Sequence, residues 1–149
     1  MSRARLAVVI SGAGSNMLAI DDACRHGALY ADVVSVISNR ADAAGLAHAA
    51  ERGIPTRLVT PIPGESRESY DERLAVAIHA VNANWIVLAG FMRILSSDFV
   101  REFTGRLLNI HPSLLPAHKG LHTHQRAIEA GDTQHGATVH FVTAELDGG

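Results

Sequence analysis

The 149-residue sequence lacks the features of a secreted or membrane protein. Its single cysteine, Cys24, cannot form a disulfide within the chain and is expected to be a buried, small apolar side chain in a helix. No apolar run is long enough to cross a bilayer, and Arg5 already begins an apolar strand where a signal peptide would lie. These absences predict a cytoplasmic protein without a membrane partner.

An excess of positive charge is also lacking. The formal net charge is -2, and the 13 Lys and Arg residues are scattered, whereas nucleic-acid binding needs basic residues clustered on one face. We therefore expect no nucleic-acid partner, and the composition gives no oligomeric state. Because 47% of the residues are hydrophobic and the one linker candidate, 60–65, is a short loop, residues 1–149 are expected to form a single domain.

Apolar segments of strand length alternate with segments of helical periodicity along the chain. Strands are expected at 5–11, 33–38, 56–59, 85–89, around Asn109 and at 138–143, and helices at 15–26, 43–52, 66–81, 97–103 and 123–131. Strands that are apolar throughout favour a mostly parallel sheet with helices on both faces. The predicted fold class is therefore α/β, with a Rossmann-like open sheet.

Asn109 and His111 form the first candidate site. Residues two apart on a strand share a face, and Pro112 marks the strand end, so the amide and the imidazole are expected at one spot. If an amine attacks a carbonyl group there, Asn109 and a protonated His111 can stabilise the oxyanion. Asp147 would raise the pKa of His111 and orient its ring, which makes His111 a general acid. The alternative is a hydrogen-bonded strand end without catalysis.

A metal site is a second interpretation of this histidine-rich region. His111, His118, His122 and His124 lie close together in the sequence. However, the chain has no cysteine pair and no His-Glu-x-x-His motif, and the four histidines fall on different predicted elements. We therefore expect no metal.

A glycine-rich loop follows the first predicted strand and reads Ser-Gly-Ala-Gly-Ser-Asn over 11–16. Free backbone N–H groups at the start of the next helix suit a phosphate group. The dinucleotide-binding motif would need a third glycine where Met17 stands and an acidic residue near Asn39, so a nicotinamide cofactor is disfavoured. The alternative is a tight turn capped by Ser15.

The segment from Trp85 to Gly149 resembles the phosphoribosylglycinamide formyltransferases, a 10-formyltetrahydrofolate-dependent formyltransferase family. The resemblance rests on four segments, which read AGFMRIL over 89–95, NIHPSLLP over 109–116, GLHTH over 120–124 and ELDGG over 145–149. It implies transfer of a formyl group from 10-formyltetrahydrofolate to the amine of glycinamide ribonucleotide in de novo purine biosynthesis. In that case Asn109, His111 and Asp147 are the catalytic residues, and no metal takes part.

The resemblance also implies two binding sites. The substrate phosphate would be bound by Gly12, Ala13, Gly14, Ser15 and Asn16, and the folate by Arg67, Met92, Arg93, Ile94, Leu95 and Asn109. From the residues alone, an arginine in the position of Arg67 is ordinarily a solvated charge, and a Met-Ile-Leu cluster is usually part of a core.

Two alternative functions stay open at this point. The same chemistry occurs in methionyl-tRNA formyltransferase and in formyltetrahydrofolate deformylase, which hydrolyses the folate. A noncatalytic phosphate-binding module would use only the glycine loop.

Members of the family continue beyond the position of Gly149 with a further strand and helix, so the fold is expected to be C-terminally truncated relative to them, and the activity of 149 residues alone is an open question.

Overall fold

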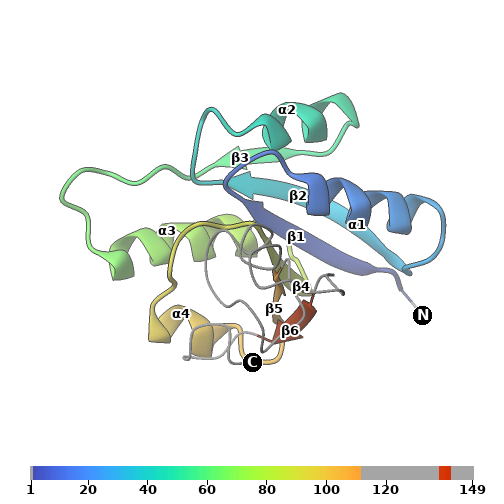
Figure 1. Ribbon diagram of the computed structural model, residues 1–149. Helices are drawn as coiled ribbons and strands as arrows, with labels where there is room; N and C mark the ends of the chain where they lie inside the picture. The colour runs from blue at the N-terminus through green and yellow to red at the C-terminus, as the bar shows by residue number, and fades with distance from the viewer. Residues whose placement is uncertain (1, 112–137, 142–149) are drawn as a thin grey trace, which may run out of the picture.

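The computed structural model describes residues 2–111 and 138–141, and Figure 1 shows their arrangement. The strands are β1 (Ala4–Ile10), β2 (Ala31–Ser38), β3 (Thr56–Leu58), β4 (Trp85–Ala89), β5 (Leu107–His111) and β6 (Thr138–Phe141), and the helices are α1 (Ser15–Arg25), α2 (Ala44–Glu51), α3 (Arg67–His79) and α4 (Ser97–Glu102). Each expected element within the described ranges is confirmed, with ends that differ by at most three residues. The helix expected at 123–131 lies outside the described residues.

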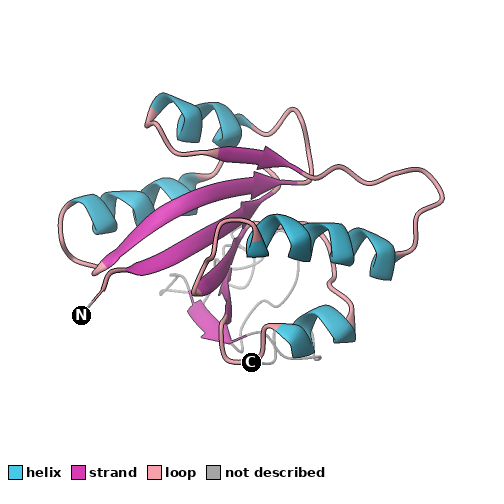
Figure 2. Ribbon diagram, turned by 180° about the vertical axis from the view of Figure 1, so that it is seen from behind, coloured by secondary structure: helices cyan, strands magenta, loops and turns pink. Residues whose placement is uncertain are grey.

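The strands form one six-stranded sheet in the order β3-β2-β1-β4-β5-β6 (Figure 2). Neighbouring strands from β3 to β5 are parallel, and β6 pairs antiparallel with β5. The chain turns back after β3 and places β4 on the other side of β1, so the strand order reverses between β1 and β4. Ligands of open α/β sheets bind outside the carboxyl ends of the strands at such a reversal.

The sheet is covered on both faces, because each central strand is apolar on both sides. In β1, Leu6 and Val8 face one core and Ala7 and Val9 face the other. Helices α1 and α2 lie over the first face, and α3 and α4 lie over the second (Figure 1). The predicted α/β class with a mostly parallel, doubly covered sheet is therefore confirmed.

The helices on the second face have defined starts that fix the chain near the carboxyl ends of the strands. Ser66 caps α3 by accepting a hydrogen bond from Ser69 N at 3.1 Å, and Ser96 caps α4 by accepting one from Phe99 N at 3.2 Å. The backbone N–H of Ser96 also donates to Asp71 Oδ2 at 2.6 Å. The loop from β4 to α4 is thereby attached to α3. Among the described helices, none is both long and apolar enough to span a membrane.

Candidate active site

The glycine loop, residues 12–16, joins β1 to α1 at the carboxyl edge, where the parallel strands end. Gly14 is the N-cap of α1, with φ 78°, and no side chain in the described part of the chain caps the helix, so the alternative of a turn capped by Ser15 is wrong. Ser15 is already the first residue of the helix, whereas a capping side chain belongs to the residue before it. The first helical amide bond runs from Leu18 N to Gly14 O at 2.9 Å, which leaves the preceding amides without a helical partner. This arrangement suits an anion.

Helix α2 supports the glycine loop through a glycine that the sequence analysis missed. The N–H of Gly45 donates to Gly12 O at 3.0 Å. A Cβ atom added at Gly45 would lie 2.3 Å from Ile10 Cδ1 and 3.1 Å from Gly14 Cα. Because the two backbones approach so closely, only glycine fits at this position. The signal available in the sequence was a glycine inside an alanine-rich helical segment.

Ser11 connects three strand ends at the carboxyl edge, and the sequence analysis also missed its role. Its side-chain hydroxyl donates to Asn39 Oδ1 at 2.6 Å and accepts from Met92 N at 2.8 Å. Ser11 follows β1, Asn39 follows β2, and Met92 lies beyond the end of β4. The predicted phosphate and folate segments are therefore adjacent in space.

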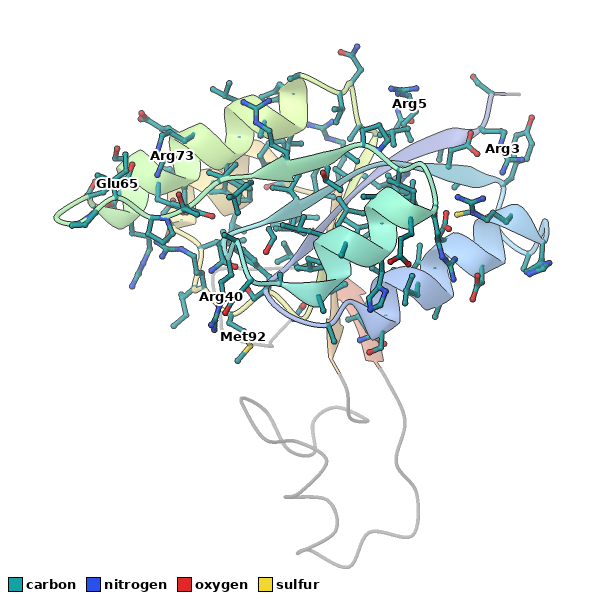
Figure 3. The ribbon with its side chains drawn as sticks, turned by 90° about the horizontal axis from the view of Figure 1, so that it is seen from above. Arg3, Arg5, Arg40, Glu65, Arg73 and Met92 are labelled. Carbon is teal, nitrogen blue, oxygen red and sulfur yellow. The ribbon has the colours of Figure 1, made fainter. Side chains whose placement is uncertain are left out.

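The predicted folate segment, Met92 to Leu95, alternates between solvent and core. Met92 and Ile94 are 58% and 60% exposed, whereas Leu95 packs against the core under α3 and α4. The core interpretation is therefore wrong for Met92 and Ile94, because the chain leaves the sheet at Gly90, whose φ is 78°. In Figure 3, Met92 points away from the sheet at the lower left of the view. The result is an exposed apolar surface at the strand ends.

Arg93 points the opposite way and stacks on α3. Its guanidinium carbon lies 4.0 Å from the centre of the Tyr70 ring. The Tyr70 hydroxyl donates to Val59 O at 2.7 Å, and burial raises the pKa of Tyr70 to about 12. The Nε atom of Arg93 is buried and has no hydrogen-bond partner within the described part of the chain. A buried donor of this kind is a candidate for a ligand contact.

Arg67 is the first residue of α3, and its side chain is exposed. Within residues 2–111 and 138–141, it makes no hydrogen bond or ion pair with Met92–Leu95. The other arginine of this helix, Arg73, forms an ion pair with Glu65 at 2.6 Å, and its guanidinium carbon lies 5.4 Å from the centre of the Tyr70 ring. The Arg73 guanidinium lowers the pKa of Glu65 to about 2. The structure therefore places Arg67 at the carboxyl edge but does not join it to the predicted folate segment.

Asn109 lies on β5, which pairs with β4 and so ends at the same edge. Its register partners are Leu88 on β4 and residue 140 on β6, and its side chain is half-buried. His111 is the last residue of β5. The side chain of His111 and the whole of Asp147 lie outside the described residues, as do His118, His122 and His124. The mutual geometry of the predicted catalytic residues therefore stays a prediction.

Two hollows in the described residues lie away from the glycine loop. One, of about 410 Å³, is at the opposite, amino edge of the sheet, where Arg3, Cys24 and Asp32 line it. The other, of about 450 Å³, lies between α3 and α4. Cys24 is 4% exposed, which confirms its expected burial, and burial raises the pKa of its thiol. Neither hollow contains a predicted site residue.

Comparisons with known proteins give a consistent result. Residues 4–149 match the formyl transferase family. The chain is 54% identical over 144 residues to the phosphoribosylglycinamide formyltransferase of Escherichia coli, which covers 97% of this chain and 68% of that protein. It is 51% identical to a trifunctional purine biosynthetic protein of Drosophila pseudoobscura pseudoobscura, which covers 99% of this chain and 11% of that much longer protein.

Solved structures agree with the sequence matches. The phosphoribosylglycinamide formyltransferase of Coxiella burnetii superimposes with a TM-score of 0.91 at 46% identity, which covers 99% of this chain and 69% of that chain. The glycinamide ribonucleotide transformylase 1 of Symbiobacterium toebii gives a TM-score of 0.92 at 44% identity. The chain thus spans about two thirds of the length of these single-function relatives.

Proposed function

Because this chain belongs to the formyl transferase family, we propose that it transfers the formyl group of 10-formyltetrahydrofolate to the amine of glycinamide ribonucleotide. The observation that carries this proposal is the identity of 54% to a phosphoribosylglycinamide formyltransferase over 97% of the chain. The trifunctional relatives are named for purine biosynthesis, which is the pathway we propose for this reaction. The single cysteine supports a cytoplasmic location.

We assign the substrate phosphate to the glycine loop, residues Gly12 to Asn16. Three features support the assignment: α1 has no side-chain cap, its N-cap is a glycine in the left-handed conformation, and the loop lies at the reversal of strand order. Because the helix dipole and the unpaired amides act on any anion, they provide affinity for the phosphate without selecting the rest of the substrate.

We assign the folate to the segment Met92 to Leu95, with Asn109 on the neighbouring strand and Arg67 at the start of α3. The exposed apolar side chains of Met92 and Ile94 suit a flat ring, and the buried Nε of Arg93 suits an acceptor atom of the ligand. This segment begins 2.8 Å from Ser11, which directly precedes the glycine loop. A ligand on one segment therefore lies beside a ligand on the other.

In the proposed reaction, the amine nitrogen attacks the formyl carbon, and the bond from that carbon to the folate nitrogen breaks. The proton that the amine releases replaces the formyl group on the folate nitrogen. We propose that His111 carries this proton, that Asn109 donates a hydrogen bond to the developing oxyanion, and that Asp147 orients His111. No metal is needed, because the amide and the imidazolium supply the electrophilic groups.

Formyl transfer to glycinamide ribonucleotide tests the proposal directly. The protein should consume 10-formyltetrahydrofolate only when the amine is present, and His111→Asn should remove most of the turnover while the protein stays folded. Consumption of the folate without the amine would instead indicate a hydrolase. If the protein binds phosphate but no folate analogue in a calorimetric titration, it is a noncatalytic phosphate-binding module.

A further inference from the structure

We propose that Ser11 is a positioning residue that couples the phosphate-binding and folate-binding segments. This inference rests on the proposed function, because it assigns a role to a residue that touches neither ligand in that proposal. Its basis is the hydrogen bonding of a single hydroxyl group that lies between the two segments.

The Ser11 side chain is buried, with 5% of the residue exposed, and its hydroxyl makes two short hydrogen bonds. The proton is given to Asn39 Oδ1 at 2.6 Å, since a carbonyl oxygen can only accept. The lone pairs then accept the backbone N–H of Met92 at 2.8 Å. A methyl group in place of the hydroxyl would leave two polar groups without partners, and a buried polar group without a partner is costly.

The 90–95 segment depends on this contact because it has left the sheet. Gly90 turns the chain away from β4 with φ 78°. In the described ranges, residues 91–95 make no backbone–backbone hydrogen bond, and the hydrogen bonds that fix the backbone at either end of the segment come from two side chains. Ser11 binds its start through Met92 N, and Asp71 binds its end through Ser96 N at 2.6 Å.

Ser11 also links the 90–95 segment to the glycine loop. Ser11 directly precedes Gly12, so its backbone moves with the glycine loop. When a phosphate fixes that loop, the hydroxyl is fixed as well, and the 90–95 segment loses conformational freedom before the folate binds. The second ligand then has less ordering to complete, which makes the binding of the two ligands cooperative.

The test measures the dissociation constant of a nonreactive folate analogue by titration calorimetry, with and without glycinamide ribonucleotide. In the unmodified protein, the ribonucleotide should tighten the analogue several-fold, by about the factor of 5 or more typical of coupled sites. Ser11→Ala should weaken the analogue about tenfold, as expected for the loss of a buried hydrogen bond, and should abolish the tightening. Ser11→Thr, which keeps the hydroxyl, should restore part of the tightening.

Ser38→Ala is the matched control. Ser38 is also a buried serine at the carboxyl end of a strand, but among the described residues its hydroxyl bonds only to the backbone of Arg40 in its own turn. This variant should keep the tightening. If Ser11→Ala does not fold, Asn39→Ala replaces it, because Asn39 is half-buried and its loss frees the same hydroxyl.

The outcomes separate the inference from the proposed function. If the unmodified protein binds neither ligand, both are wrong. If it transfers the formyl group and Ser11→Ala, or Asn39→Ala in its place, keeps the tightening in full, only the inference is overturned. An equal loss in Ser38→Ala also overturns it, because the effect would then be a general consequence of lost stability.

Discussion

The two edges of the sheet use their polar groups differently. At the amino edge, charges are paired with one another: Arg3 binds Asp32 at 3.1 Å, and Asp21 binds both Arg25 at 2.6 Å and Arg52 at 2.9 Å. The carboxyl edge also has ion pairs, Arg40–Asp42 and Arg73–Glu65, but there the glycine loop presents amides that no described side chain caps. In Figure 3, Arg3 and Arg5 lie to the upper right and Met92 lies to the lower left.

This contrast separates the edge that maintains the fold from the edge that is available to ligands. Charged groups that are already paired have little affinity for a further molecule. The carboxyl edge instead has groups that a ligand can contact: the uncapped amides of the glycine loop, the buried Nε of Arg93, which has no described partner, and the exposed side chains of Met92 and Ile94. Changes to the amino-edge ion pairs should therefore alter stability without altering activity, and changes to the glycine loop or to Asn109 should alter activity.

The largest effect is expected for Asn109→Ala. Removal of one hydrogen-bond donor to an oxyanion lowers kcat by roughly 10²–10³-fold, and the melting temperature should change little because Asn109 is only half-buried. Steady-state kinetics and thermal unfolding check this result. A variant with full kcat would remove Asn109 from the proposed catalytic site and weaken the functional distinction between the edges.

Gly45→Ala should have the next largest effect. The added methyl group would lie 3.1 Å from Gly12 O and Gly14 Cα and would displace the glycine loop, as well as the flexible end of Ile10. Overpacking of this kind costs about 1–3 kcal/mol, and we expect KM for glycinamide ribonucleotide to rise more than kcat falls. Ala47→Ser, on the exposed side of the same helix, is the control and should leave both constants unchanged.

Asp21→Ala should show the reverse pattern at the amino edge. Asp21 is 4% exposed and accepts hydrogen bonds from two arginines, so its loss should lower the free energy of unfolding by about 1–2 kcal/mol. The two arginines are partly exposed, which allows water to replace the carboxylate. Chemical denaturation measures the loss, and kcat should be unaltered. A fall in kcat with unchanged stability would contradict the comparison.

The smallest effect concerns Glu65 in the loop before α3. Its pKa is lowered from 4.5 to about 2, mainly by the hydrogen bond from Arg73. Since the pKa is lower in the folded state, the stabilisation is complete above about pH 4.5 and is lost as the pH falls towards 2. The melting temperature of Glu65→Gln should thus lie below that of the unmodified protein at pH 7, and the gap should shrink between pH 5 and 3. A constant gap would exclude the ion pair as its cause.

The sequence predicted the strands of the sheet and the position of the glycine loop between a strand and a helix. Strands such as Trp85–Ala89 are continuous apolar runs, and the glycine loop stands between a strand and a helix, so local patterns suffice for both. Contacts between distant residues were not predictable in this way. The bonds of Ser11 to Asn39 and Met92 join residues 28 and 81 positions apart, and the fit of Gly45 against Gly14 depends on how α2 packs.

The helix cap shows a second reason for error. Ser15 has the right residue type for an N-cap, but Gly14 takes the left-handed conformation and starts the helix one residue earlier. Residue type alone does not distinguish these two positions. Similarly, Met92 and Ile94 are residue types that are usually buried, yet the turn at Gly90 directs their side chains to solvent.

The measurement that tests the central claim most directly is a map of backbone amide chemical shifts during titration with glycinamide ribonucleotide and then with a folate analogue. The first ligand should shift the amides of residues 12–16, and the second should shift those of residues 91–95, with the amino edge around Arg3 and Asp32 unchanged. Shifts concentrated at the amino edge, with residues 12–16 and 91–95 unaffected, would contradict the account.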